Sequence, residues 1–367
     1  MKPCLKQHGI GDQQLGVGLV DLLVAMLISL LLLAGIGQIY ISSRAANEYS
    51  DNLSRLNENA RFAISLLTKN LRMAGHLPCE PLRFSSVVSD SAINDFIDFS
   101  RSIEGVDQVS DAAVDDWYAG AVDGTDALKI IFSGDKEDRS FTIQSHVPGS
   151  AAIKLSSSMH SFKEGMYITV CDSEHGALFQ NSSSPKWGYD LFHEAGGGGN
   201  CTANLGYPTE CGGGRGHTFS EGSQVAELQG RVFYIGASKS GAGRSLYQRP
   251  LSFEGKSGIY TADKEELVED VENLQLLYGI DSTADDDSVP DRYVRADSVT
   301  DWSRVVAVQL WVIVSTNKAL RDFTDENSYG SEGYVIGGEH EVPIPPGAEE
   351  KYRVVLSSTI QLRNRVL

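Results

Sequence analysis

A run of 22 residues without a charge, Leu22 to Ser43, constrains the fold of this chain more than any other feature. Its first part, Leu22–Tyr40, is long enough to cross a bilayer of about 30 Å as an α-helix. An acidic residue stands directly before the run, at the end of the sequence Gly16-Val17-Gly18-Leu19-Val20-Asp21. A carboxylate so close to a membrane-length apolar helix costs free energy, so we expect Asp21 to have a function that offsets this cost.

Residues 1–16 form a short polar leader that carries Lys2 and Lys6 against Asp12. Positive charges favour the cytoplasmic side of a membrane, which puts the leader in the cytoplasm and most of the chain outside. A secretory signal peptide would have a cleavage site of small residues after its apolar stretch, and the sequence after Tyr40 has none. One interpretation is therefore an uncleaved single-pass anchor, Leu15–Ile41, that carries a periplasmic enzyme or binding protein.

A second interpretation comes from the residues around the glycine that ends the leader. The pattern Gly16, Val17, Leu19, Val20, Asp21 and Leu22 resembles the leader of a type IV prepilin. Two positions depart from that pattern, because Val17 stands where the family usually has Phe or Met, and Asp21 where it usually has Glu. The resemblance implies that a prepilin peptidase cuts between Gly16 and Val17 and methylates the new Val17 amine.

The same resemblance gives Asp21 a partner. Its carboxylate would pair with the Val17 ammonium of an adjacent pilin subunit when the helices bundle in a filament. Opposite charges attract strongly in a low-dielectric bundle, whereas either charge alone is penalised there.

The apolar run continues into an amphipathic pattern. Apolar residues recur at helical spacing from Leu53 through Leu56, Ala60 and Ala63 to Leu71. Gly75 and Pro78 are stop signals, so the sequence predicts one long helix over residues 17–74. We therefore divide the chain into a leader (1–16), a transmembrane or filament-core half of the helix (17–40), its amphipathic half (41–75) and a periplasmic β-rich head (76–367).

The head is predicted to be strand-rich, since its segments of β-branched and aromatic residues are bounded by Gly, Asp and Ser. The predicted strands are Leu128–Ser133, Ser140–Ser145, Met166–Asp172, Ala226–Ile235, Ser245–Gln248, Val305–Ser315 and Lys351–Leu362. One later helix is expected over Asp263–Leu277, because Asp263 and Glu266 have the spacing of a capping box. A Gly-rich insert, residues 195–216, is expected to be an irregular surface loop. The predicted fold is α+β and type IV pilin-like: a long N-terminal helix, its apolar half protruding, packed on a mostly antiparallel sheet.

Three further sequence blocks narrow the resemblance to the PilW-type minor pilins. These blocks are residues 53–63 with 71–75, residues 271–275 with 278–281, and the terminal Leu362-Arg363-Asn364-Arg365. The resemblance implies a non-enzymatic inner-membrane protein that joins other minor pilins, the major pilin and the pilus assembly platform to prime or cap a type IV pilus. A minor pseudopilin of a type II secretion system has the same leader and stays open as the alternative.

The cysteines fit an oxidising compartment. Cys4 lies in the leader, and four cysteines remain outside it: Cys79, Cys171, Cys201 and Cys211. An even number outside the membrane predicts disulfides, and three pairings are possible. Our first choice is Cys201–Cys211, which staples the Gly-rich insert, and it leaves Cys79–Cys171 as the second bridge. A zinc site of Cys201 and Cys211 with His193 or His217 is the rival interpretation.

No complete catalytic motif is present, and the sequence predicts neither an enzyme nor a cofactor. The eight histidines are scattered without clustered spacing. The net charge of −18 argues against a nucleic-acid partner, which requires a basic surface. The best metal candidate is a calcium site at Asp281, Asp285, Asp287 and Asp291, although these residues do not fit the EF-hand pattern and a solvated acidic loop is the simpler interpretation.

Overall fold

The chain divides into two compact units, residues 1–53 and residues 54–367, and each is described by itself. The computed structural model describes residues 18–89, 91–110, 117–134, 140–147, 151–158, 160–182, 188–196, 199–207, 211, 215–241, 243–253, 259–261, 263–283, 287–320, 324–325, 329–330, 341–342 and 349–364.

A single 53-residue helix, α1 (Leu19–Leu71), confirms the predicted long N-terminal helix. Its residues up to Leu53 make up the described part of the first unit, and the rest belongs to the second. In the second unit α1 buries Leu56, Ala60, Ala63 and Leu67, which follow one another at intervals of three or four residues on one face. These are the apolar positions that the sequence pattern predicted.

The end of α1 is set by Gly75. This residue has φ +72°, in the left-handed region that glycine enters without steric cost, and its N–H donates to the Ile131 carbonyl at 2.8 Å. The C-terminal segment closes over the same point, because the Asn364 amide donates to the Arg72 carbonyl at 2.7 Å. A β-carbon on Gly75 would collide with the Asn364 carbonyl. The first and last segments of the head are thus fastened together at the end of the helix.

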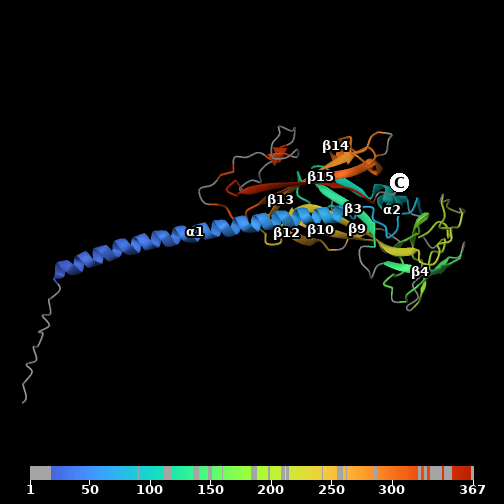
Figure 1. Ribbon diagram of the computed structural model, residues 1–367, viewed down its shortest axis with the longest axis horizontal. Coiled ribbons are helices and arrows are strands. Elements are labelled where there is room, and N and C mark those ends of the chain that lie inside the picture. The colour runs from blue at the N-terminus through green and yellow to red at the C-terminus, as the bar shows by residue number, and fades with distance from the viewer. Residues whose placement is uncertain are drawn as a thin grey trace, which may run out of the picture. The chain divides into compact units, whose positions relative to one another are not determined.

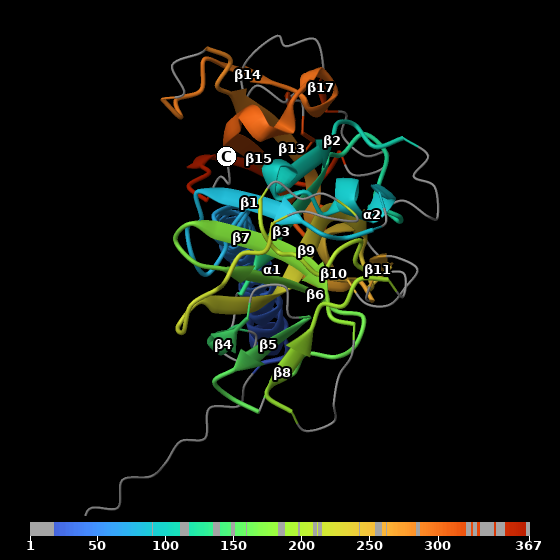
Figure 2. The ribbon, with the colours of Figure 1, turned by 90° about the vertical axis from the view of Figure 1, so that its right-hand side faces the viewer.

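The larger sheet is organised around its longest strand, β9 (Gln224–Ala237). Residues 224–227 of β9 pair with β4 and β6, and residues 228–237 pair with β3 and β10, so β9 takes part in two adjoining pieces of sheet. Figure 2 shows β1, β7 and β6 side by side, with β4, β5 and β8 grouped together. The strands are β1 (Arg83–Ser86), β2 (Ile103–Val106), β3 (Ala127–Ser133), β4 (Ser140–His146), β5 (Ala152–Leu155), β6 (Tyr167–Cys171), β7 (His175–Gln180), β8 (Asp190–Phe192), β9, β10 (Arg244–Phe253), β11 (Ile259–Thr261) and β12 (Glu265–Glu269).

A smaller sheet of four antiparallel strands has the order β14-β13-β15-β18. Its strands are β13 (Val271–Ile280), β14 (Arg292–Val294), β15 (Val305–Ser315) and β18 (Arg353–Gln361). Leu274, Leu276 and Tyr278 of β13 belong to the same core as the buried face of α1. The remaining elements of the described residues are the short helix α2 (Ser91–Phe96), three single-turn 3-10 helices and a two-stranded ribbon, β16 (Tyr329–Gly330) with β17 (Glu341–Val342).

The α+β class is confirmed (Figure 1), and so are all seven predicted strands. Among the strand pairs of the described residues, only β1–β7 is parallel. The predicted helix over Asp263–Leu277 is wrong, because the structure has β12, a turn at Asp270 with φ +63°, and β13 there. β13 alternates residues that face the α1 core with Asn273 and Gln275, which bond to the Gly124 carbonyl. Nine residue pairs with β15 then outweigh the local capping-box signal.

One close approach locks the larger sheet to the smaller one. A β-carbon on Gly105 of β2 would fall on the hydroxyl of Tyr278, whose side chain is fully buried and packs edge-on against Trp302 at 4.8 Å. The Tyr278 hydroxyl has no hydrogen-bond partner among the described residues. Only glycine therefore fits position 105 beside the ring of Tyr278.

Gly105→Ala should destabilise the head by about 1–3 kcal/mol, because the buried ring cannot move away from the new methyl group. Tyr278→Phe should restore only part of this loss in the double variant, since it removes the hydroxyl that the methyl group meets first but leaves the ring carbon Cζ at 2.6 Å. Denaturant unfolding of the full chain in detergent, followed by circular dichroism, measures both effects. A Gly105→Ala protein as stable as the wild type would contradict the proposed fit.

Candidate assembly site

Asp21 lies in the first turn of α1, where an acidic side chain is favoured by the exposed N–H groups of the helix end. Its Oδ2 accepts a hydrogen bond from the Gly18 N–H at 3.3 Å. It is the only charged residue from Leu19 to Ser43. The predicted processing residues, Gly16 and Val17, lie outside the described residues, so their geometry relative to Asp21 stays a prediction.

The helix around Asp21 presents apolar side chains in every direction. Each large apolar side chain from Leu19 to Ile41 is at least 51% exposed. By length and composition α1 is able to cross a membrane, and it is the one such helix among the described residues. The hydroxyl of Ser29 donates to the Ala25 carbonyl at 2.7 Å, so it needs no outside partner. A surface of this extent requires a cover of lipid or of other apolar helices.

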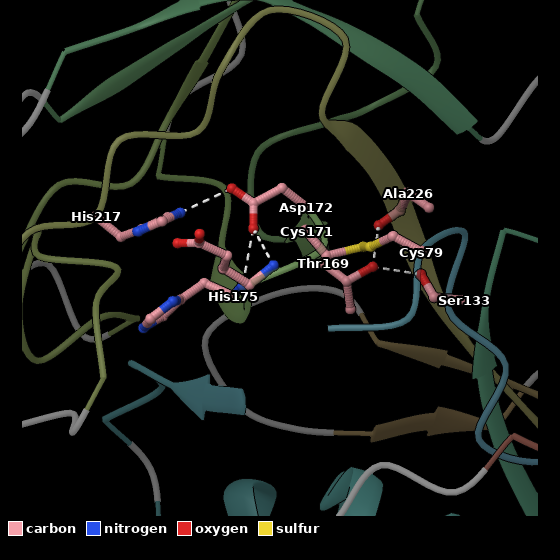
Figure 3. Close-up of a disulfide and its surroundings, with 9 residues drawn as sticks. Cys79, Ser133, Thr169, Cys171, Asp172, His175, His217 and Ala226 are labelled. Atoms are coloured by element: carbon pink, nitrogen blue, oxygen red, sulfur yellow. Dashed lines mark hydrogen bonds and ion pairs between the residues drawn. A yellow bond between two sulfur atoms is a disulfide. The ribbon is translucent and has the colours of Figure 1, made fainter. Parts of the chain in front are cut away.

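Two disulfides hold the head, with the pairing that was our first choice. Cys79 follows α1 and is bridged to Cys171, the last residue of β6, with 6.1 Å between their Cα atoms. Cys201 is bridged to Cys211 with a Cα separation of 4.9 Å. Figure 3 shows the first bridge beside Thr169, whose hydroxyl lies 2.6 Å from that of Ser133 and 3.2 Å from the Ala226 carbonyl. Both cysteines of the zinc candidate are therefore used in a bridge.

The acidic loop uses its carboxylates to hold its own backbone. Asp281 is 1% exposed, accepts the Ser288 N–H at 3.2 Å and lies 3.6 Å from the Arg304 guanidinium. Asp291 accepts hydrogen bonds from the backbone and hydroxyl of Ser282 and from the Thr283 N–H. These bonds hold the pKa of the Asp291 carboxyl below its usual value.

The other two calcium candidates add little to a metal site. Asp287 accepts the Val289 N–H at 2.8 Å, and Asp285 lies outside the described residues. Within the part of the chain that the structure describes, no three His, Cys, Asp or Glu side chains are placed to hold a metal ion. The carboxylates that we can place are accounted for by loop contacts.

The fold gathers four histidines that are far apart in the sequence. They are His146, His175, His193 and His217, from four different segments. The His146 ring contacts the rings of His193 and Phe219, and the His217 ring contacts those of Phe219 and His175, with centroid distances of 4.3 to 5.6 Å. Histidines that are scattered in the sequence are thus neighbours in the structure. No spacing in the sequence signals the cluster, because it depends on which strands pair.

The Gly-rich insert is also more than a surface loop. Although its described residues contain no helix or full strand, Asn200 and Leu205 are each 1% exposed. The Asn200 side chain accepts the Gln180 N–H and donates to the Gln180 carbonyl, both at 2.7 Å, and the Cys201 N–H donates to the Val87 carbonyl. The buried hydrogen bonds of Asn200 and Cys201 therefore take the place of the hydrogen bonds that a strand would make with its neighbours.

The polar residues of β13 are structural. Glu272 receives two hydrogen bonds from the Arg353 guanidinium of β18, at 2.6 and 3.1 Å, and Asp325 receives a third at 3.0 Å. All three side chains are at most 7% exposed. This buried cluster ties the segment after β15 back to the smaller sheet.

A buried carboxyl on the other side of β13 fixes the segment before β3. Asp126 accepts the N–H groups of Gln108 and Leu276 at 2.9 and 2.7 Å. Burial, together with the neighbouring charge of Asp107, raises the pKa of Asp126 to about 8 despite these bonds. Asp126 therefore links residues 107–126 to β13.

Arg353→Met should destabilise the head by about 3–5 kcal/mol, because it leaves Glu272 and Asp325 buried without a counter-charge. Arg363→Met, which removes an equal charge from an exposed position, should change the unfolding free energy by less than about 0.5 kcal/mol. Denaturant titration of the full chain compares the two variants. Equal stabilities would show that the buried cluster does not hold the sheet.

Comparison with known proteins gives a family match for part of this chain. Residues 232–364, from within β9 to the segment that closes on the end of α1, match the family model of PilW, type IV pilus-assembly protein W. No curated protein and no solved structure gives a match to the chain. The matched region contains the whole smaller sheet with its buried Arg353 cluster. Residues 232–364 are thus similar to the PilW family, and this match supports a PilW-type type IV pilus-assembly protein.

Proposed function

We propose that the chain is a non-enzymatic minor pilin that takes part in priming or capping a type IV pilus. The observation that carries this proposal is the PilW match over residues 232–364, in a chain that also has an apolar α1 of membrane-spanning length. The match is to an assembly family, which favours pilus assembly over a membrane-anchored enzyme or binding protein. Because the matched family is one of type IV pilus assembly, the match also favours a type IV pilus over a type II secretion system.

The proposed maturation begins at the leader. A prepilin peptidase cleaves between Gly16 and Val17 on the cytoplasmic face of the inner membrane and methylates the Val17 amine. Residues 17–40 then form the membrane or filament-core part, residues 41–75 the amphipathic part of the helix, and residues 76–367 the periplasmic head. The cleaved chain has an ammonium group four residues before Asp21, and both charges lie at the start of an uncharged helix.

The charge of Asp21 is satisfied in different ways in the membrane and in a filament. In the membrane, Asp21 at the helix start can reach the headgroup region, where water and lipid polar groups solvate it. In a bundle of apolar helices that solvent is lost, and the carboxylate needs a positive partner. The Val17 ammonium of an adjacent subunit, another minor pilin or the major pilin, supplies it. The assembly platform would then draw the paired subunits out of the membrane together.

The size of the head supports a position at the start or tip of the filament. Residues 54–367 form the second unit and contain both sheets. Repeating so large a head along a shaft would crowd successive subunits, whereas a single copy at the tip has free space on its outer side.

Asp21→Ala should leave membrane insertion intact and reduce recovery in sheared filaments by about tenfold or more, since it removes the partner of the Val17 ammonium. Asp21→Glu should recover at or above the wild-type level, because one further methylene extends the reach of the carboxylate. Asp51→Ala is the matched control: it removes an exposed acid from the same helix beyond the apolar run. Quantitative immunoblots of membrane and filament fractions make the comparison. Normal filament recovery of Asp21→Ala would contradict the proposed charge pair.

A further inference from the structure

The part of the insert that the structure describes rests on the histidine cluster. We call residues 199–207 and 215–219 the clasp. It is fastened at one end by Asn200 and Cys201, and it places Leu205 and Phe219, each 1% exposed, in the same core cluster as β4, β5 and β8. His217 belongs to the clasp, while His146, His175 and His193 belong to the strands and strand ends beneath it.

The contact between His146 and the clasp requires a neutral imidazole. The Phe219 N–H donates to His146 Nδ1 at 3.3 Å, and the two rings stack with 5.6 Å between centroids. Nδ1 accepts this hydrogen bond only through its lone pair, so the proton of the neutral ring is on Nε2. A proton added at Nδ1 would turn the acceptor into a second donor and break the contact.

His193 lies fully buried under the clasp, where a charged ring is disfavoured. It is 0% exposed, packs on the rings of Phe179 and His146, and neither ring nitrogen makes a hydrogen bond of normal geometry. Burial, helped by the neighbouring His146, lowers the pKa of His193 to about 4, and a backbone contact with Ala203 opposes this only in part. Of the described ionisable groups, only His146 acts on it by charge.

A second histidine pair lies at the other end of the clasp. His217 Nε2 lies 2.8 Å from Asp172 Oδ2, and the His175 ring stacks on the His217 ring with 4.3 Å between centroids (Figure 3). Burial and the charges of His217 and Arg83 lower the pKa of His175, against the opposing charges of Asp172 and Glu174. A second proton on this pair would place two positive rings face to face.

We propose that the clasp is an acid-sensitive element that detaches when His146 and His193 take up protons, while the PilW-type part of the head stays folded. This device goes beyond the proposed role in assembly and does not depend on it. The residues that hold the smaller sheet, such as Glu272 and Arg353, belong to a separate cluster with its own counter-charges. Protonation of the histidines therefore acts on one side of the head only.

The expected pH window follows from the sign of the shift. The folded pKa of His193 is below its ordinary value of 6.5, so the closed clasp is favoured above pH 6.5 and loses this advantage as the pH falls toward 4. If the ring titrates normally in the open form, the ratio of open to closed clasp rises about 30-fold between pH 7.5 and pH 5.

Hydrogen–deuterium exchange of the full chain in detergent micelles tests this proposal, with rates corrected for the intrinsic effect of pH. Protection of peptides from the clasp should fall by about 30-fold between pH 7.5 and pH 5. Peptides from β13 and β15 should keep their protection in the same samples. A flat profile in the clasp, or an equal fall in β13 and β15, would overturn the proposal without any variant.

Variants assign the effect to the histidines. The double variant His146→Asn, His193→Phe keeps a hydrogen-bond acceptor at one position and an aromatic ring at the other. Its clasp should lose most of the dependence on pH, because only the His175–His217 pair then remains. His76→Gln, which changes a half-buried histidine in the segment after α1, should keep the wild-type profile. A double variant that retains the pH-dependent fall would overturn the assignment.

Discussion

The structure depends on one helix that meets two different surroundings. From Leu22 to Ser43 α1 is uncharged and exposes apolar side chains, and in the head it buries a single stripe that runs from Leu56 to Leu71. Other residues of the head cover the stripe, whereas the apolar side chains at the start of α1 are exposed in the first unit. Because hydrophobic surface of this size is unstable in water, lipid and neighbouring helices are the two environments open to it. Membrane residence and filament assembly both cover this apolar surface. They differ for Asp21, which polar headgroups and water solvate in the membrane and which needs a positive partner in a filament.

The head is organised to hold that stripe, and β13 is its central strand. Leu274 and Leu276 pack into the core of α1, Glu272 pairs with Arg353, and Gln275 holds the segment before β3 through the Gly124 carbonyl. The polar residues that mark this region in the sequence are therefore explained by folding. The proposed assembly contact therefore depends on the N-terminal helix. The histidine cluster is a separate feature and lies in another part of the head.

Sequence patterns predicted those helices and strands that depend mainly on local interactions. The apolar run and its heptad-like continuation predicted α1, the turn signals at Gly75 predicted its end, and runs such as Val305–Ser315 predicted strands to within a residue or two. The helix predicted over residues 263–277 was wrong because the capping-box signal is local, whereas the strand that forms there depends on pairing with β15 some thirty residues later. His146 and His193 could not be linked from sequence for the same reason, since only the pairing of β4 with β5 and β5 with β8 brings them together.

The central claim is that cleavage after Gly16 turns Asp21 from an isolated acid into an assembly contact. Intact-mass and peptide mass spectrometry of the protein from cells with and without an active prepilin peptidase measures this directly. The account predicts an N-methylated chain that starts at Val17 when the peptidase is active, and a chain that keeps residues 1–16 when it is not. A chain that keeps its leader in both strains would contradict the account and would identify α1 as a permanent anchor.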